Sequence, residues 1–222
     1  MTALILVPMA SAHNVSADNR SFVEALNGPA PIAYMYLGAK HMVTGLDHVF
    51  FLIGVVFFLK KLPDIVTYVS LFTIGHSLTL LIGVLAGITV NPFVIDAIIG
   101  LSVVYKAFEN IGGFDRLFGA KLDMRAAVFA FGLAHGLGLA TKLQDLTLSE
   151  NGLLINLLSF NVGVEIGQVL VLLVIVSLLN LWRPFQSFPS GARMANIALM
   201  VGGFVLMGQH LVGFFVSGGP HA

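Results

Sequence analysis

The block GLLINLLSFNVGVEIGQVLVLLVIVSLLNL, residues 152–181, carries one charged side chain, Glu165, in its whole length. An α-helix needs about 20 mainly apolar residues to cross a bilayer, so this block is long enough to span one. Five further apolar blocks follow the same pattern, at approximately 32–59, 65–89, 92–112, 124–142 and 194–216. Short polar breaks rich in Pro and Gly divide them. The sequence therefore predicts an all-α fold, a polytopic transmembrane helical bundle of about six spans.

The composition supports a membrane-embedded chain. Apolar residues make up 57% of it and charged residues 10%, against roughly 25% charged in a soluble domain. The formal net charge is zero, with 11 basic and 11 acidic residues, which removes any whole-protein argument for binding nucleic acid. The absence of cysteine excludes disulfides and thiolate metal sites, so a bound metal must use imidazole, carboxylate, carbonyl or water.

The basic residues predict the orientation of the bundle. Cytoplasmic loops hold the excess of Lys and Arg in membrane proteins. Seven basic residues lie in the first, third and fifth breaks: Lys60, Lys61, Arg116, Lys121, Arg125, Arg183 and Arg193. Three lie on the opposite side: Arg20, Lys40 and Lys142. We therefore expect a multi-pass membrane protein with both termini outside, on the periplasmic side if the cell is a Gram-negative bacterium.

The chain divides into one large domain and two short ends. Residues 1–29 begin with MTALILVPMASAH, an apolar run ending in small residues like the back half of a secretory signal. We expect a signal remnant followed by a segment at the membrane surface, with an ordinary apolar tail as the alternative. Residues 30–217 form the transmembrane domain, and 218–222 are a short C-terminal tail.

The stretch KHMVTGLDHVFFL, residues 40–52, places His41, Asp47 and His48 inside an apolar run. Such groups are costly at membrane depth, and they are ligands that divalent transition metals prefer. On a straight helix the two imidazoles would be about 10 Å apart along the axis. One ion, bound at about 2.1 Å from each ligand, could not reach both. Either the helix breaks near Gly45 or the residues form two successive sites.

Polar side chains occur in the other spans too. The main candidates for metal ligands are His41, Asp47, His48, His76, His135 and Glu165, and the secondary candidates are Asn161, Gln168, His210, Glu109 and Asp96. Structural alternatives stand beside several of them. His76 and His210 could donate interhelical hydrogen bonds, Asn161 and Gln168 could hold helices together, Glu109 could pair with Lys106, and Asp96 could cap a helix.

Spacing makes two of these expectations sharper. Asn161, Glu165 and Gln168 stand at i, i+4 and i+7, one stripe of a helix, and we expect that stripe to face the bundle interior. Small residues at 132, 136 and 140 repeat at intervals of four. Such a ridge predicts close packing of this span on a neighbour, with His135 near the contact.

Five motifs resemble the HupE/UreJ family, especially its second subfamily. They are His41-x5-Asp47-His48, FTIGHSLTL at 72–80, VVYKAFEN at 103–110, FGLAHGLGLA at 131–140 and NVGVEIGQ at 161–168. The resemblance covers about 30–215. It implies a bacterial membrane protein of the nickel-permease type, in which His41, Asp47 and His48 correspond to the functional signature. His135 is followed by Gly and Leu, and its helix lacks the Glu of the family's second motif, which leaves copper, cobalt or zinc open as the ion.

The leading interpretation is thus a permease for a divalent transition metal ion, nickel first, working in the lipid bilayer and not as an enzyme. An intramembrane zinc-type hydrolase and an accessory membrane subunit are the alternatives. A hydrolase needs three converging ligands and an opening to substrate, whereas a permease needs ligands spread along a path. We expect no nucleic acid partner, and the chain could assemble as an oligomer.

Overall fold

The computed structural model describes residues 28–119, 123–145 and 151–217, and every regular element in those ranges is an α-helix. In chain order they are α2 (Pro31–Thr44), α3 (Leu46–Val56), α4 (Leu62–Leu85), α5 (Pro92–Asn110), α6 (Gly113–Phe118), α7 (Met124–Gln144), α8 (Leu153–Trp182) and α9 (Phe188–Val216). The all-α prediction is confirmed, and each of the six apolar blocks corresponds to a long helix or, for the first block, to α2 and α3 together. The predicted signal remnant and surface segment within 1–27 and the tail 218–222 lie outside the described residues.

Helix starts follow local chemistry. Four of these helices, α2, α4, α5 and α9, have Pro in the first two positions, where its missing N–H costs nothing. The side chain of Asn91 accepts hydrogen bonds from the backbone N–H groups of residues 93 and 94 at the start of α5. Asp123 caps α7 in the same way. These caps fix where the spans begin.

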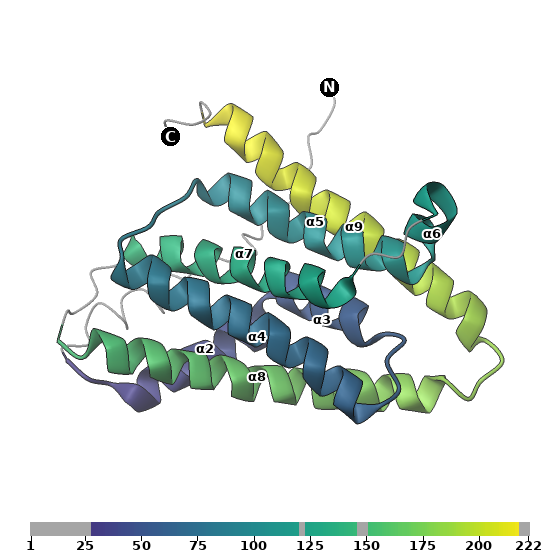
Figure 1. Ribbon diagram of the computed structural model, residues 1–222, viewed down its shortest axis with the longest axis horizontal. Helices are drawn as coiled ribbons and strands as arrows, with labels where there is room; N and C mark the ends of the chain where they lie inside the picture. The colour runs from purple at the N-terminus through teal and green to yellow at the C-terminus, as the bar shows by residue number, and fades with distance from the viewer. Residues whose placement is uncertain (1–27, 120–122, 146–150, 218–222) are drawn as a thin grey trace, which may run out of the picture.

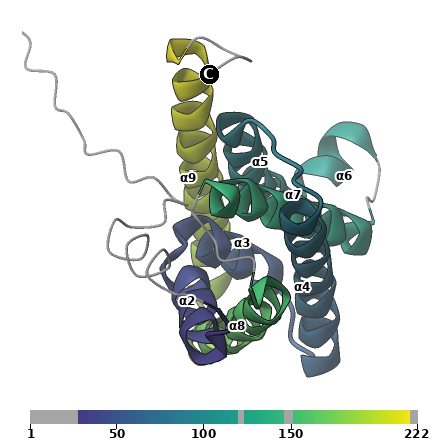
Figure 2. The ribbon, with the colours of Figure 1, turned by 90° about the vertical axis from the view of Figure 1, so that its left-hand side faces the viewer.

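The bundle consists of three helix pairs around a short central helix. Helix α4 runs beside α7, α2 beside α8, and α5 beside α9 (Figure 1). Helix α3 lies between the pairs and contacts α2, α4, α5, α8 and α9. The end-on view shows α3 inside the ring of longer helices (Figure 2). Residues at the start of α3 are therefore surrounded by protein.

Small residues let the paired helices approach closely. In the α4/α7 pair, a Cβ added at Gly132 would overlap the backbone of Phe72, and one added at Gly136 would overlap the backbone carbonyl of His76. Only glycine permits this spacing. The predicted ridge is confirmed, and its partner is α4. Glycines with comparably close backbone neighbours join the other two pairs: Gly38, Gly163 and Gly167 for α2/α8, and Gly100 and Gly203 for α5/α9.

Within the described residues, four helices are long and apolar enough to cross a membrane: α4, α7, α8 and α9. Helices α2 and α3, bent by 66° at the break between them, would make a fifth, broken span. Helix α5 is 19 residues long and carries Asp96, Lys106 and Glu109, so its composition does not place it in this set. The sixth span and the outward-facing termini stay predictions.

Candidate metal centre

The break between α2 and α3 brings His41 and His48 together. Gly45 ends α2 and begins α3: its N–H donates to the carbonyl of His41 at 2.9 Å, and its own carbonyl accepts from Val49 at 3.0 Å. The ring centroids of the two histidines are 4.9 Å apart. Of the two alternatives that the sequence left open, the broken helix is therefore the one found.

Glycine is favoured at position 45 by crowding and not by its backbone angles. Its φ of −72° and ψ of 100° are open to any residue. An added Cβ, however, would lie 3.0 Å from His48 Nδ1, 3.0 Å from the His41 carbonyl oxygen and 3.2 Å from Asp47 Oδ1. Ligand atoms of His48 and Asp47 and the backbone of His41 thus lie around the position that a larger side chain would fill.

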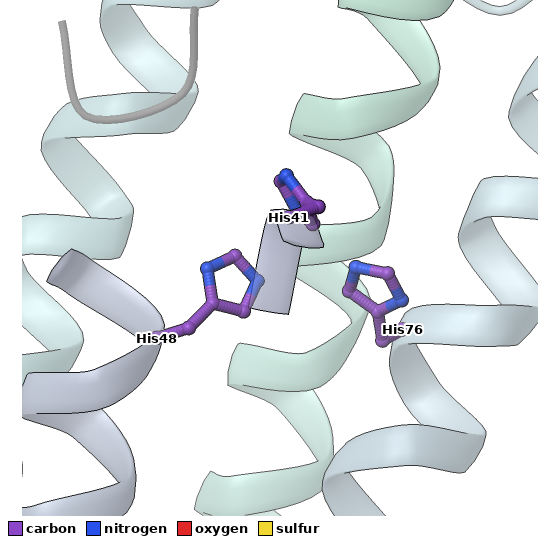
Figure 3. A group of neighbouring side chains, drawn as sticks. All are labelled: His41, His48 and His76. Atoms are coloured by element: carbon purple, nitrogen blue, oxygen red, sulfur yellow. The ribbon is translucent and has the colours of Figure 1, made fainter. Parts of the chain in front are cut away.

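His76 completes the first group of ligands. It comes from α4, and its ring centroid lies 5.9 Å from that of His48 and 6.5 Å from that of His41. One potential ligand atom from each of the three residues lies within 4.8 Å of the others (Figure 3). Two ligands of one ion at about 2.1 Å are at most about 4.2 Å apart, so modest side-chain movement would close the group on an ion.

A second group shares His48 with the first. It consists of Asp47, His48 and His135, whose ligand atoms also lie within 4.8 Å of one another. His135 Nδ1 is 2.7 Å from the carbonyl oxygen of Phe131, a contact that suits an Nδ1–H donor. Such a bond leaves Nε2 with the lone pair that a metal needs, as in many histidine metal ligands. Asp47 brings a carboxylate 3.3 Å from His48 Nδ1.

The two groups are closed off from solvent. His48, His76 and His135 are fully buried, Asp47 is 1% exposed, and His41 is partly buried. Both ring nitrogens of His76 are buried with no hydrogen-bond partner among the described residues. Native proteins rarely leave buried polar atoms unsatisfied, and a bound cation would satisfy one of these nitrogens. Imidazole and carboxylate donors fit nickel, cobalt, copper or zinc.

Glu165 joins neither group of ligands, which corrects the expectation that its whole stripe faces the interior. Asn161 and Gln168 are buried, and Gln168 Oε1 accepts a hydrogen bond from Thr73 on α4 at 2.6 Å. Glu165 is exposed at the wall of a groove between α4 and α8. Helix α8 packs on α2 through Gly163 and its neighbours. Glu165 lies outside this contact and faces the groove instead.

The secondary candidates at the two ends of α5 are ion-paired. Lys142 donates to both carboxylate oxygens of Asp96, at 2.9 and 2.8 Å, and His210 Nδ1 lies 3.6 Å from Asp96 Oδ2. The alternative in which Asp96 caps a helix is wrong, because Asn91 caps α5. The other alternative, a Lys106–Glu109 pair, is confirmed at 2.5 Å.

Lys142 is the residue near this centre that sequence reasoning missed. We counted it only among the basic residues on the outer side, but α7 continues to Gln144 and holds Lys142 inside its last turn. The available signal was its spacing. Lys142 follows His135 by seven residues, which places both on one helix face.

These features define a class of protein: a helical membrane protein with a buried centre of imidazole and carboxylate groups. The sequence model of one family, described as HupE / UreJ protein, matches residues 17–218. The chain therefore belongs to the HupE/UreJ family, whose members are permease-like membrane proteins. Searches among curated proteins and among solved structures found no match to the chain.

Proposed function

We propose that this protein is a permease of the bacterial inner membrane for a divalent transition metal ion, with nickel as the first candidate. The observation that carries the proposal is the pair of buried ligand groups that share His48. Nickel is favoured by the family, while copper, cobalt and zinc use the same donor atoms. The ion is the transported substrate in this proposal.

The shared histidine suggests how an ion would move. An ion held by His41, His48 and His76 can exchange two of these ligands for Asp47 and His135 while it keeps His48. Each step replaces some of the ligands while others stay bound, which keeps the barrier to movement low in a buried site. Asp47 adds a negative charge to the second group, which favours the cation there.

The same geometry is less suited to a hydrolase. A catalytic zinc needs an open coordination position that substrate can reach. The groove between α4 and α8 has a volume of about 930 Å³, but none of the five clustered residues, His41, Asp47, His48, His76 and His135, lines it. Ligands that are buried and lie outside the lining of this groove support ion passage over hydrolysis.

Uptake and binding measurements test the proposal together. Nickel uptake is measured in a bacterial host that lacks its own importer, and Ni²⁺ binding is measured on purified full-length protein. We expect uptake by the wild type and strong losses in His41→Ala, Asp47→Ala and His48→Ala at equal membrane abundance. Ser102→Ala is the matched control, because Ser102 is fully buried and its hydroxyl donates to Ile99 of its own helix. Wild-type activity in all three ligand variants would overturn the proposal.

A further inference from the structure

A second cluster of charged groups lies beside the histidine groups. It joins three helices: Asp96 on α5, Lys142 on α7 and His210 on α9. The side chains are 7%, 15% and 15% exposed, respectively, so the cluster is nearly enclosed. Lys142 satisfies both oxygens of the carboxylate, and the imidazole of His210 stands at the edge of the pair, 3.6 Å from Oδ2.

The cluster is located between the histidine groups and one end of the bundle. Lys142 lies two helical turns beyond His135 on the same face of α7, about 10 Å along the axis. Asp96 is in the second turn of α5, near the end of the bundle where α5 begins and α7 ends (Figure 1). The topology inferred from the sequence makes this the outer end.

The chemistry of the cluster matches that of the metal groups. Without the ammonium of Lys142, a carboxylate and an imidazole from two different helices would face one another, the same donor types as Asp47 and His48. Lysine carries its charge on a flexible stem of four carbons, and Lys142 is in the last turn of its helix. Its ammonium can therefore leave Asp96 without unfolding the helix.

We propose that Asp96 and His210 form an additional cation site in which Lys142 is a tethered competitor for the transported ion. The inference rests on the proposed function. Asp96 holds either the ammonium or a metal ion, and a divalent transition metal gains a bond from His210 that Lys142 does not. Monovalent ions such as Na⁺ lack that advantage, since imidazole is a poor ligand for them. An ion must therefore bind Asp96 more strongly than Lys142 does, and this competition favours divalent ions on the way to the histidine groups.

The Lys106–Glu109 pair at the other end of α5 provides a matched control. Lys106 is also buried and also donates to a carboxylate, but its second partner is the side-chain oxygen of Asn110, at 2.8 Å. Among the described residues, neither metal-ligand group includes Lys106, Glu109 or Asn110. Removing the Lys106 charge should therefore create no site that a transition metal prefers.

The test is the number of Ni²⁺ ions bound by purified full-length protein, measured by calorimetric titration and by metal analysis. We expect Lys142→Met to bind one more Ni²⁺ per chain than the wild type, and the gained site to disappear in Lys142→Met/Asp96→Asn and in Lys142→Met/His210→Ala. Lys106→Met and Lys142→Arg should gain none, because the first lies elsewhere and the second keeps a cation on Asp96. If Lys142→Met does not fold, Lys142→Gln removes the charge and keeps a hydrogen-bond donor for Asp96.

The outcomes separate this inference from the proposed function. A folded Lys142→Met or Lys142→Gln variant with wild-type stoichiometry overturns the competitor role, as does a gained site that survives Asp96→Asn. A wild type that binds no Ni²⁺ contradicts the proposed function. If the wild type binds no Ni²⁺ but Lys142→Met binds one ion per chain, that result would still support the site at Asp96 and His210.

Discussion

The histidine groups are buried and the polar network around Asn110 is partly buried, and the two regions differ in how completely their atoms are hydrogen-bonded. Asn110 Nδ2 donates to the carbonyl of Gly54 on α3 at 2.7 Å and to Asn196 Oδ1 on α9 at 2.8 Å, and Asn110 accepts from Lys106. Asn196 donates in turn to Ala192. His76, by contrast, leaves two buried ring nitrogens unbonded among the described residues. A saturated network joins helices, whereas an unsaturated group is suited to receive a ligand.

The largest effect should come from His48→Ala, because His48 belongs to both groups of ligands. Its loss leaves two ligands in each group. We expect Ni²⁺ affinity to fall by about 100-fold or more, beyond the 10–100-fold typical of outer-shell changes. His41→Ala, which removes a ligand from one group only, should cost less. Titration of both purified variants with Ni²⁺ shows which one loses more affinity. Equal losses would argue against the idea that His48 serves both groups of ligands.

Asn110→Ala should affect stability and spare binding. It removes hydrogen bonds to α3 and α9 and leaves buried partners unsatisfied, at a cost of about 1–3 kcal/mol in the free energy of unfolding. Thermal unfolding of the purified protein should show a clear drop in Tm. The folded variant should bind Ni²⁺ like the wild type. A weakened metal site with an unchanged Tm would reverse the contrast drawn between the two regions.

Gly45→Ala should act on the metal groups by crowding. The added methyl would press on His48 Nδ1 and Asp47 Oδ1, which must move by a few tenths of an ångström. We expect Ni²⁺ affinity to fall about tenfold, a loss of about 1.4 kcal/mol. Gly202→Ala is the control, since its nearest side-chain atom beyond its own helix lies at an ordinary 3.7 Å. Unchanged affinity in Gly45→Ala would show that the ligands bind from a different arrangement.

Glu165→Gln should have the smallest effect on metal binding. Glu165 faces the groove between α4 and α8 and stands apart from both ligand groups. We expect less than about a threefold change in Ni²⁺ affinity, which corresponds to about 0.6 kcal/mol. Loss of uptake with intact binding would give the carboxylate a role in movement of the ion. A large loss of affinity would place it in the metal centre after all.

The helices could be predicted from the sequence because apolar blocks of sufficient length must hydrogen-bond their own backbone inside a membrane. Close packing of α7 on a neighbour could also be predicted, because Gly132 and Gly136 have no side chain and let another helix backbone approach. The grouping of His48 with His76 and His135 could not be predicted. It depends on a 66° bend at Gly45 and on the placement of α3 among the other helices, which local spacing does not encode.

The polar stripe on α8 also shows that local spacing does not predict which neighbours cover a helix face. Asn161, Glu165 and Gln168 do share a helix face, as their spacing requires. What covers that face depends on the neighbours of α8. Helix α4 reaches Gln168 through Thr73, while Glu165 remains at the open groove. Periodicity predicts which residues share a face, and the packing of the whole bundle decides whether that face is buried.

The break at Gly45 also ends two helix dipoles in the interior of the protein. The carboxyl end of α2, with its partial negative charge, lies at His41, and the amino end of α3, with its partial positive charge, lies at Asp47 and His48. With the site closed to solvent, these partial charges are screened little. The backbone therefore favours a cation beside His41 and a negative charge at Asp47, so a break of one residue polarises the centre before any side chain contributes.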